Sequence, residues 1–252
     1  MLFFKRILKE PEPAGAAVPP VERRSTQRYL VNPLFSIKAV LSFIGRDDTG
    51  APMSHSRHGW NWKGRLLNCS EQGVRIQMGP TLRVQARDLC DLNLTVDDFQ
   101  LSVPCHIANI RENAEGPVFG LQHDIEDEGT WQAYRQLIEV LALGSTLKLH
   151  GRTDEPDESG YRVENYVSDR PARLTIWRHP DDASVSAFEF QLKDNLVRAA
   201  ERQRLEFLTG AGARPATAAK ALEIQRLFSW VVPNLATAVP ADVRDFLKHY
   251  AA

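Results

Sequence analysis

Three arginines stand close together near the start of the chain. The stretch VERRSTQRYLV, Val21 to Val31, places Arg23, Arg24 and Arg28 just ahead of a more apolar, strand-like segment. A guanidinium group is planar, always charged, and able to donate two parallel hydrogen bonds to a phosphate or to the edge of a guanine. These residues suit an arm that closes on an anion carrying planar, hydrogen-bonding groups. The alternative is a solvated lead-in, which is what most short charge clusters are.

Small polar residues gather further along the chain, in the stretch NCSEQG. Asn68, Ser70 and Gly73 lie there on an expected turn between two strands. Short polar side chains on a fixed turn can contact a guanine edge or a phosphate. The glycine would supply a positive φ or a close backbone approach that a side chain would block. Arg75 should alternate outward in the next strand and could add a phosphate or stacking contact.

The two clusters form the motifs RxxxR and NxSxxG, in that order and in the expected strand context. This combination resembles the PilZ domain family, the bacterial receptors for the second messenger cyclic di-GMP. The resemblance covers roughly residues 20–145, including VFGLQH, which is similar to the family's last barrel strand, and the helix after it. The chain departs from the commoner pattern in having asparagine in place of aspartate and a long connection between the first two strands.

The resemblance implies a cytoplasmic cyclic di-GMP receptor, not an enzyme, that transmits the signal to a protein partner the sequence does not identify. In the family, an arginine just before RxxxR goes with an intercalated pair of ligands, so Arg23 favours that pair here. Motility, adhesion, exopolysaccharide synthesis and secretion are all outputs that the family implies. Ordering some six arm residues costs on the order of 6–12 kcal/mol, which favours an arm that folds only over its ligand. The expected ligand-binding residues are Arg23, Arg24, Arg28, Asn68, Ser70, Gly73 and Arg75.

Alternating apolar residues predict a series of short strands after the arm, beginning with SIKAVLSF and ending with VFGLQH. An amphipathic helix should follow, with Thr130 as its N-cap and Gly144 as its stop. We therefore expect a mainly β fold with some α: a six-stranded antiparallel barrel of the PilZ type with a closing C-terminal helix, over residues 21–145. Residues 1–20 should form a flexible N-terminal segment, because they are rich in proline and alanine.

A polar stretch at residues 151–160 suggests a break before a second region, a small α+β extension or domain over 151–252. RLTIW and AFEFQL look like strands around a turn, whereas LVRAA and RLEFLTG fit either strand or helix. Pro215 and Pro240 should each open a helix. This organisation predicts that a chain ending near residue 150 folds and still binds ligand.

Composition limits the class of partner and the compartment. The formal net charge of -1 argues against a general DNA- or RNA-binding protein, which would show a basic excess. The three cysteines have no CxxC or Cys/His ligand spacing, so neither a disulfide framework nor a structural zinc site is expected, and a reducing compartment fits best. The N-terminal MLFFKRIL is too short to span a bilayer, and we find no transmembrane segment.

Other candidate sites are weaker. His55 and His58 form an HxxH pair without an evident third ligand, so we interpret them as part of a polar loop and expect no metal or cofactor. No serine, histidine and carboxylate arrangement marks a catalytic site. Two further function classes stay open: a PilZ-like interaction module that does not bind nucleotide, and an enzyme within 151–252 under nucleotide control.

Overall fold

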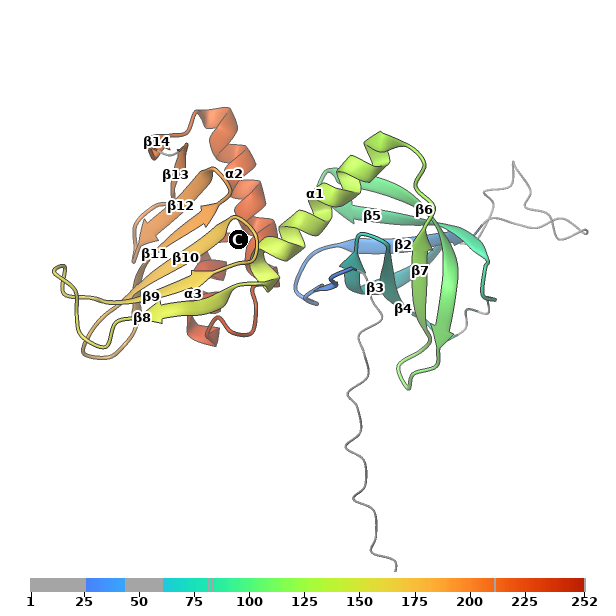
Figure 1. Ribbon diagram of the computed structural model, residues 1–252, viewed down its shortest axis with the longest axis horizontal. Helices are drawn as coiled ribbons and strands as arrows, with labels where there is room; N and C mark the ends of the chain where they lie inside the picture. Colours follow the sequence, from blue (N-terminus) through green and yellow to red (C-terminus); the bar gives the residue numbers. More distant parts are fainter. Residues whose placement is uncertain (1–25, 44–60, 81, 83, 211, 252) are drawn as a thin grey trace, which may run out of the picture.

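The computed structural model describes residues 26–43, 61–80, 82, 84–210 and 212–251 (Figure 1). Arg23, Arg24, the segment 1–20 and the pair His55 and His58 lie outside these ranges. The first half of the described chain forms seven strands: β1 (Tyr29–Leu30), β2 (Lys38–Phe43), β3 (Asn61–Ser70), β4 (Gly73–Met78), β5 (Leu89–Val96), β6 (Phe99–Arg111) and β7 (Val118–His123).

Six of these strands close into an antiparallel barrel, as the sequence predicts. The order is β3-β2-β5-β6-β7-β4, and a further pairing of β3 with β4 joins the two ends. The short β1 is an extra strand that pairs with the last part of β3, Tyr29 opposite Cys69 and Leu30 opposite Asn68. Strand β2 pairs with the first part of the same strand, so the arm enters the barrel beside the NxSxxG motif.

Alternating side chains fill the barrel. In β2, Ala39 and Leu41 are buried while Lys38 is exposed, and β5 buries Leu92 and Leu94 against them. Apolar residues at every second position point to one face of a strand, so closing the sheet places them all inside.

Helix α1 (Glu128–Ser145) closes the barrel but does not begin or end as the sequence predicts. Asp127, not Thr130, is the N-cap: its carboxylate accepts a hydrogen bond from the backbone N–H of Thr130 at 2.7 Å. Gly144 lies inside the helix and does not stop it. A Cβ there would lie 2.9 Å from the carbonyl oxygen of Val231 and 3.0 Å from that of Asn234, so the glycine permits a close approach of the second half of the chain.

The second half of the chain forms an antiparallel meander of seven strands with helices on one side (Figure 1). LVRAA and EFLT are strands, which the sequence left open, and the polar stretch after residue 152 is the loop of a hairpin whose first strand the sequence missed. Pro215 lies in a strand and the helix after it starts with Thr217 as N-cap, whereas Pro240 directly precedes the last helix, as expected. The elements are β8 (Lys148–Arg152), β9 (Arg162–Val167), β10 (Ala172–Arg178), β11 (Val185–Leu192), β12 (Asn195–Ala200), β13 (Glu206–Thr209), β14 (Arg214–Pro215), α2 (Ala218–Val231), the 3-10 helix η1 (Val232–Asn234) and α3 (Ala241–Ala251).

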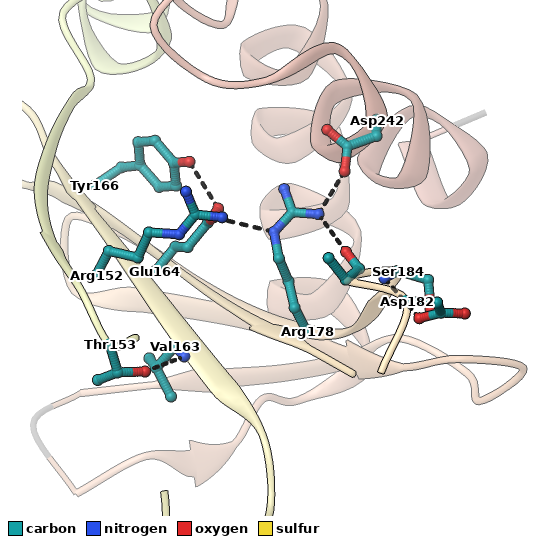
Figure 2. A network of polar contacts seen from close by, with 10 residues as sticks. Arg152, Thr153, Val163, Glu164, Tyr166, Arg178, Asp182, Ser184 and Asp242 are labelled. Atoms are coloured by element: carbon teal, nitrogen blue, oxygen red, sulfur yellow. Dashed lines mark hydrogen bonds and ion pairs between the residues drawn. The ribbon is translucent and has the colours of Figure 1, made fainter. Parts of the chain in front are cut away.

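A buried ionic network holds α3 to this sheet (Figure 2). The carboxylate of Glu164 contacts the guanidinium groups of Arg178 at 3.1 Å and Arg152 at 3.0 Å, and it accepts a hydrogen bond from Tyr166 at 2.8 Å. Arg178 also bonds Asp242 near the start of α3. Burial of Glu164 and Arg178 is tolerated because each charge has an oppositely charged partner.

Helix α1 belongs to two hydrophobic cores. Tyr134, Ile138 and Leu141 pack into the barrel core, whereas Val140 and Leu143 pack into the core between the second sheet and its helices. In Figure 1 the helix runs from the barrel to the second sheet, joining the two. The two halves are therefore packed together along one continuous element.

Candidate functional site

Arg28 and Asn68, one from each predicted motif, meet in the structure. The guanidinium of Arg28 donates a hydrogen bond to the side-chain oxygen of Asn68 at 3.0 Å, across forty residues of sequence. The pairing of β1 with β3 accounts for this contact, because it places the residue before Tyr29 beside the end of β3. Arg23 and Arg24 lie outside the described residues, so of the expected arm arginines the structure places Arg28.

The NxSxxG turn is built by its own residues. The hydroxyl of Ser70 donates to the carbonyl oxygen of Gly73 at 3.0 Å, and the backbone carbonyl of Ser70 accepts from the hydroxyl of Tyr134 on α1 at 3.0 Å. Ser70 is 1% exposed, so it closes the turn from within.

Gly73 allows strand β7 to approach this turn. A Cβ at Gly73 would lie 2.1 Å from the carbonyl oxygen of Leu121, which no side chain could accommodate. Its φ is not positive, so of the two roles that the sequence allows, close backbone approach is the one seen. The glycine of the motif is required by the barrel itself.

Arg75 lies in β4 opposite Asn68 of β3 and Gly120 of β7. It is half-buried, whereas its neighbours Val74 and Ile76 are fully buried in the core. This alternation directs Arg75 away from the core, as predicted, on the strand next to Asn68. Of the seven expected residues, Asn68 and Ser70 thus lie on β3 and Gly73 and Arg75 on the adjacent β4, while Arg28, just before β1, contacts Asn68.

An open cavity of about 600 Å³ lies against this part of the barrel. Arg28 and Gly73 line it together with Gln122 and His123 of β7 and with Trp131 of α1. Its volume is within the range of small-ligand sites, and its walls are mostly polar. The sequence interpretation missed the contributions of Gln122, His123 and Trp131, which only the closure of the barrel and the start of α1 bring together.

Trp131 contributes an aromatic ring to the lining of this cavity. It stacks on Tyr134 with ring centroids 6.3 Å apart and an interplanar angle of 20°. The guanidinium of Arg135 lies 4.8 Å from the centre of its ring. These two neighbours fix the orientation of the indole, which lies only partly buried.

His123 is uncharged in this environment. Burial lowers the pKa of its imidazole from 6.5 to about 4, more than the nearby backbone carbonyl of Glu71 and the carboxylate of Asp124 raise it. The ring packs edge-on against Tyr134 at 4.3 Å, and its Nδ1–H faces the carbonyl oxygen of Glu71 at 3.4 Å. The buried Nε2 has no hydrogen-bond partner in the protein.

Carboxylates also line the cavity, at Glu71, Glu126, Asp127 and Glu128. The hydrogen bonds that Asp127 accepts from Thr130 lower its pKa, so this carboxylate is committed to capping α1. The remaining acidic groups offer acceptors for N–H donors such as those of a guanine. Because these carboxylates repel an anion, a negatively charged ligand would need several arginines around it to bind here.

Two absences are seen among the residues that the structure describes. No helix in the described ranges has the length and apolar character needed to cross a membrane. No cluster of three or more histidine, cysteine or acidic residues suited to a metal ion occurs in the same part of the chain. The three cysteines are free and buried, and burial raises the pKa of the thiols of Cys69 and Cys90 to about 12.

The sequence comparison with known families covers the barrel and most of helix α1. The sequence model of the PilZ domain family matches residues 22–142. Among solved structures, the crystal structure of the PilZ domain of CeSA from a cellulose-synthesizing bacterium matches with 12% sequence identity and a TM-score of 0.32, over 44% of this chain and 94% of that one. No curated protein matches the chain.

Proposed function

Because residues 22–142 form a PilZ domain, we propose that this protein is a cyclic di-GMP receptor whose arginine arm is ordered over the ligand. PilZ domains are generally receptors for this nucleotide and are binding modules, not typically enzymes. We assign the protein to the cytoplasm, where a second messenger of this kind acts.

The hydrogen bond between Arg28 and Asn68 is the observation that carries the proposal. It joins the two sequence motifs, and its Arg28 end lines an open cavity, which supports a shared role of the motifs in binding a ligand there. Arg28 can exchange its neutral partner Asn68 for a phosphate or for the O6 and N7 acceptors of guanine, with which a guanidinium forms stronger or bidentate bonds. Asn68, released from Arg28, then offers its amide to the ligand.

Recognition of guanine requires both donors and acceptors. Arg28 and Arg75, with Arg23 and Arg24, supply the donors, and Glu71 supplies a carboxylate acceptor for the ring N–H groups. Trp131 offers an aromatic surface on which a base can stack, an interaction of about 1–3 kcal/mol. Adenine presents an N–H donor where guanine has O6, so the arginine contacts select against cyclic di-AMP.

The structure reduces the entropic cost of closing the arm. Tyr29 and Leu30 already pair with β3, and Thr26 already lines the cavity, so this end of the arm needs no further ordering. If ligand binding fixes three further residues, 23–25, the cost is on the order of 3–6 kcal/mol. The contacts of Arg23 and Arg24 with the phosphates must exceed that cost, which makes the arm a switch between free and bound states. Arg23 favours an intercalated pair of ligands, and a protein partner reads the closed arm.

Thermal denaturation with a panel of nucleotides tests this proposal. Cyclic di-GMP at about a hundred times its Kd should stabilise the folded protein by about 2.7 kcal/mol and raise the Tm, whereas GTP, GMP and cyclic di-AMP at the same concentration should not. Asn68→Ala and Ser70→Ala should reduce the shift, although Ser70→Ala also removes a bond of the turn and lowers the Tm without ligand. Equal shifts with all four nucleotides would contradict guanine recognition by the arm.

A further inference from the structure

The segment that carries Arg28 lies between the barrel and the second half of the chain. Arg28 bonds Asn68 of the barrel, and the next residue, Tyr29, accepts a hydrogen bond on its hydroxyl from the guanidinium of Arg170 at 2.8 Å. Asn32 then donates its backbone N–H to the side chain of Asn234 at 3.0 Å. The segment thus contacts the barrel through Arg28 and the second half of the chain through Tyr29 and Asn32.

Arg170 stands on a turn that is itself fixed in place. This turn joins β9 to β10, and its backbone N–H at Arg170 bonds the hydroxyl of Ser168 at 3.0 Å. The same hydroxyl lies 2.5 Å from that of Thr146, the C-cap of α1, and the carbonyl oxygen of Pro171 accepts from the backbone of Lys193. The guanidinium is therefore presented to the arm from a rigid element.

One of the charges near Arg170, that of Glu71, belongs to the proposed ligand site. The hydrogen bond with Tyr29 is the main cause that raises the pKa of Arg170, and the carboxylates of Glu139 and Glu71 add to it. Glu71 is part of the NxSxxG turn and lines the cavity. The guanidinium carbon of Arg170 also lies 6.0 Å from the centre of the Tyr29 ring, at the outer limit of a cation–π interaction.

We infer that Arg170 is a positioning residue for cyclic di-GMP binding, through which the second half of the chain holds the arm in its binding-competent place. This inference rests on the proposed function. Tyr29 is buried and covalently adjacent to Arg28, so fixing its hydroxyl fixes the backbone from which Arg28 projects. A preorganised arm loses less entropy when the ligand binds. Linkage is reciprocal, so bound ligand must strengthen the contact between Tyr29 and Arg170 by the same factor.

Calorimetric titration of the full-length protein with cyclic di-GMP tests the inference with four variants. Arg170→Gln and Tyr29→Phe each remove one partner of the bond and keep most of the packing, and each should weaken affinity by about three- to tenfold. The double variant should have the same affinity as the single variant that binds more weakly, because the two substitutions remove the same hydrogen bond. Arg170→Lys keeps a charged donor and should recover part of the loss.

The matched control is Arg226→Gln. Arg226 makes another contact between the two halves, an ion pair with Asp98 at 3.0 Å, away from the arm. Its substitution should leave the affinity within about twofold of the wild type, since the arm keeps its own contacts. An equal loss in Arg226→Gln and Arg170→Gln would show a general effect of packing between the halves and would overturn the positioning role.

Hydrogen exchange separates a positioning role from a merely structural one. Saturating cyclic di-GMP should slow exchange in residues 168–172 of the wild type, and this protection should be lost in Tyr29→Phe. Wild-type affinity in Arg170→Gln, with loss of binding in Arg28→Ala, would leave the receptor function intact and refute the inference. A wild-type protein that does not bind the nucleotide would refute the proposed function itself.

Discussion

Ser70, Gly73 and His123 show how closely the proposed site is joined to the stability of the barrel. Ser70 closes the turn with a hydrogen bond, and Gly73 allows β7 to approach closely. His123 packs edge-on against Tyr134, whose hydroxyl donates a hydrogen bond to the turn. A change at any of these positions alters folding as well as binding. Arg28 is different, because its side-chain contact is with Asn68 at the edge of the cavity, so its substitution should be the more specific probe of ligand recognition.

Protonation of His123 should make the protein less stable in mild acid. The pKa of His123 is about 4 in the folded protein and 6.5 for a solvent-exposed imidazole, so between these pH values the unfolded chain binds a proton that the folded protein does not. Above pH 6.5 both states are neutral and the histidine has no effect. Stability should therefore fall as the pH decreases from about 6.5 to about 4, by on the order of 2 kcal/mol at pH 5.

Urea unfolding at pH 7 and pH 5 measures this effect in His123→Phe and the wild type. The variant should lose less stability between the two values, by on the order of 1–2 kcal/mol. His150→Gln, at an exposed position of β8, serves as the control and should behave as the wild type. The same pH dependence in His123→Phe as in the wild type would contradict the assignment of a neutral, buried imidazole.

At the scale of elements, the sequence predicts strands better than it predicts helix ends. The barrel strands follow from alternation, because one face of each strand is buried. Thr130 was a plausible N-cap by type, but the carboxylate of Asp127 takes that position. Gly144 has the residue type of a helix stop, but its role is to allow close packing against η1. Because η1 lies about ninety residues further along the chain, the local sequence does not reveal this contact. Strand β8 was missed because its residues are nearly all exposed.

The network that binds α3 to the second sheet should be important for the stability of that half. Arg178→Met would leave Glu164 buried with fewer cationic partners and release Asp242. Removing one partner of a buried pair costs about 3–5 kcal/mol. Arg198→Met, which breaks an exposed pair with Glu206 in the same sheet, should cost no more than about 1 kcal/mol. Urea unfolding compares the two, and equal losses would contradict a stabilising role for the buried network.

At the scale of the whole molecule, the Arg28–Asn68 contact was predictable as a pairing of motifs, whereas the contact with Arg170 was not. The two motifs together predict that Arg28 and Asn68 belong to one site. Tyr29 and Arg170, in contrast, are 141 residues apart and belong to no shared motif. Trp131 and His123 were also missed, since nothing in their local sequence indicates a cavity. Long-range packing of the second half against the arm decides these contacts.

The shared helix α1 changes what we expect of a shortened chain. A chain ending at residue 150 would expose Val140, Leu143 and Leu147, all buried in the second core, and each such side chain contributes about 1.5–3 kcal/mol when buried. We expect that chain to self-associate in size-exclusion chromatography. Replacing the three residues with glutamine should restore a monomer that binds cyclic di-GMP more weakly than the full chain, because Arg170 is missing. A monomeric, unsubstituted short chain with full affinity would contradict both points.

Calorimetric titration of the wild type and of Arg24→Ala/Arg28→Ala with cyclic di-GMP tests the central claim most directly. The wild type should bind, and each single substitution should lower the affinity at least about tenfold, which is about 1.4 kcal/mol. The double variant should show no measurable binding while its Tm without ligand stays near that of the wild type, since Arg28 makes a partly exposed contact. Wild-type affinity in the folded double variant would contradict the account.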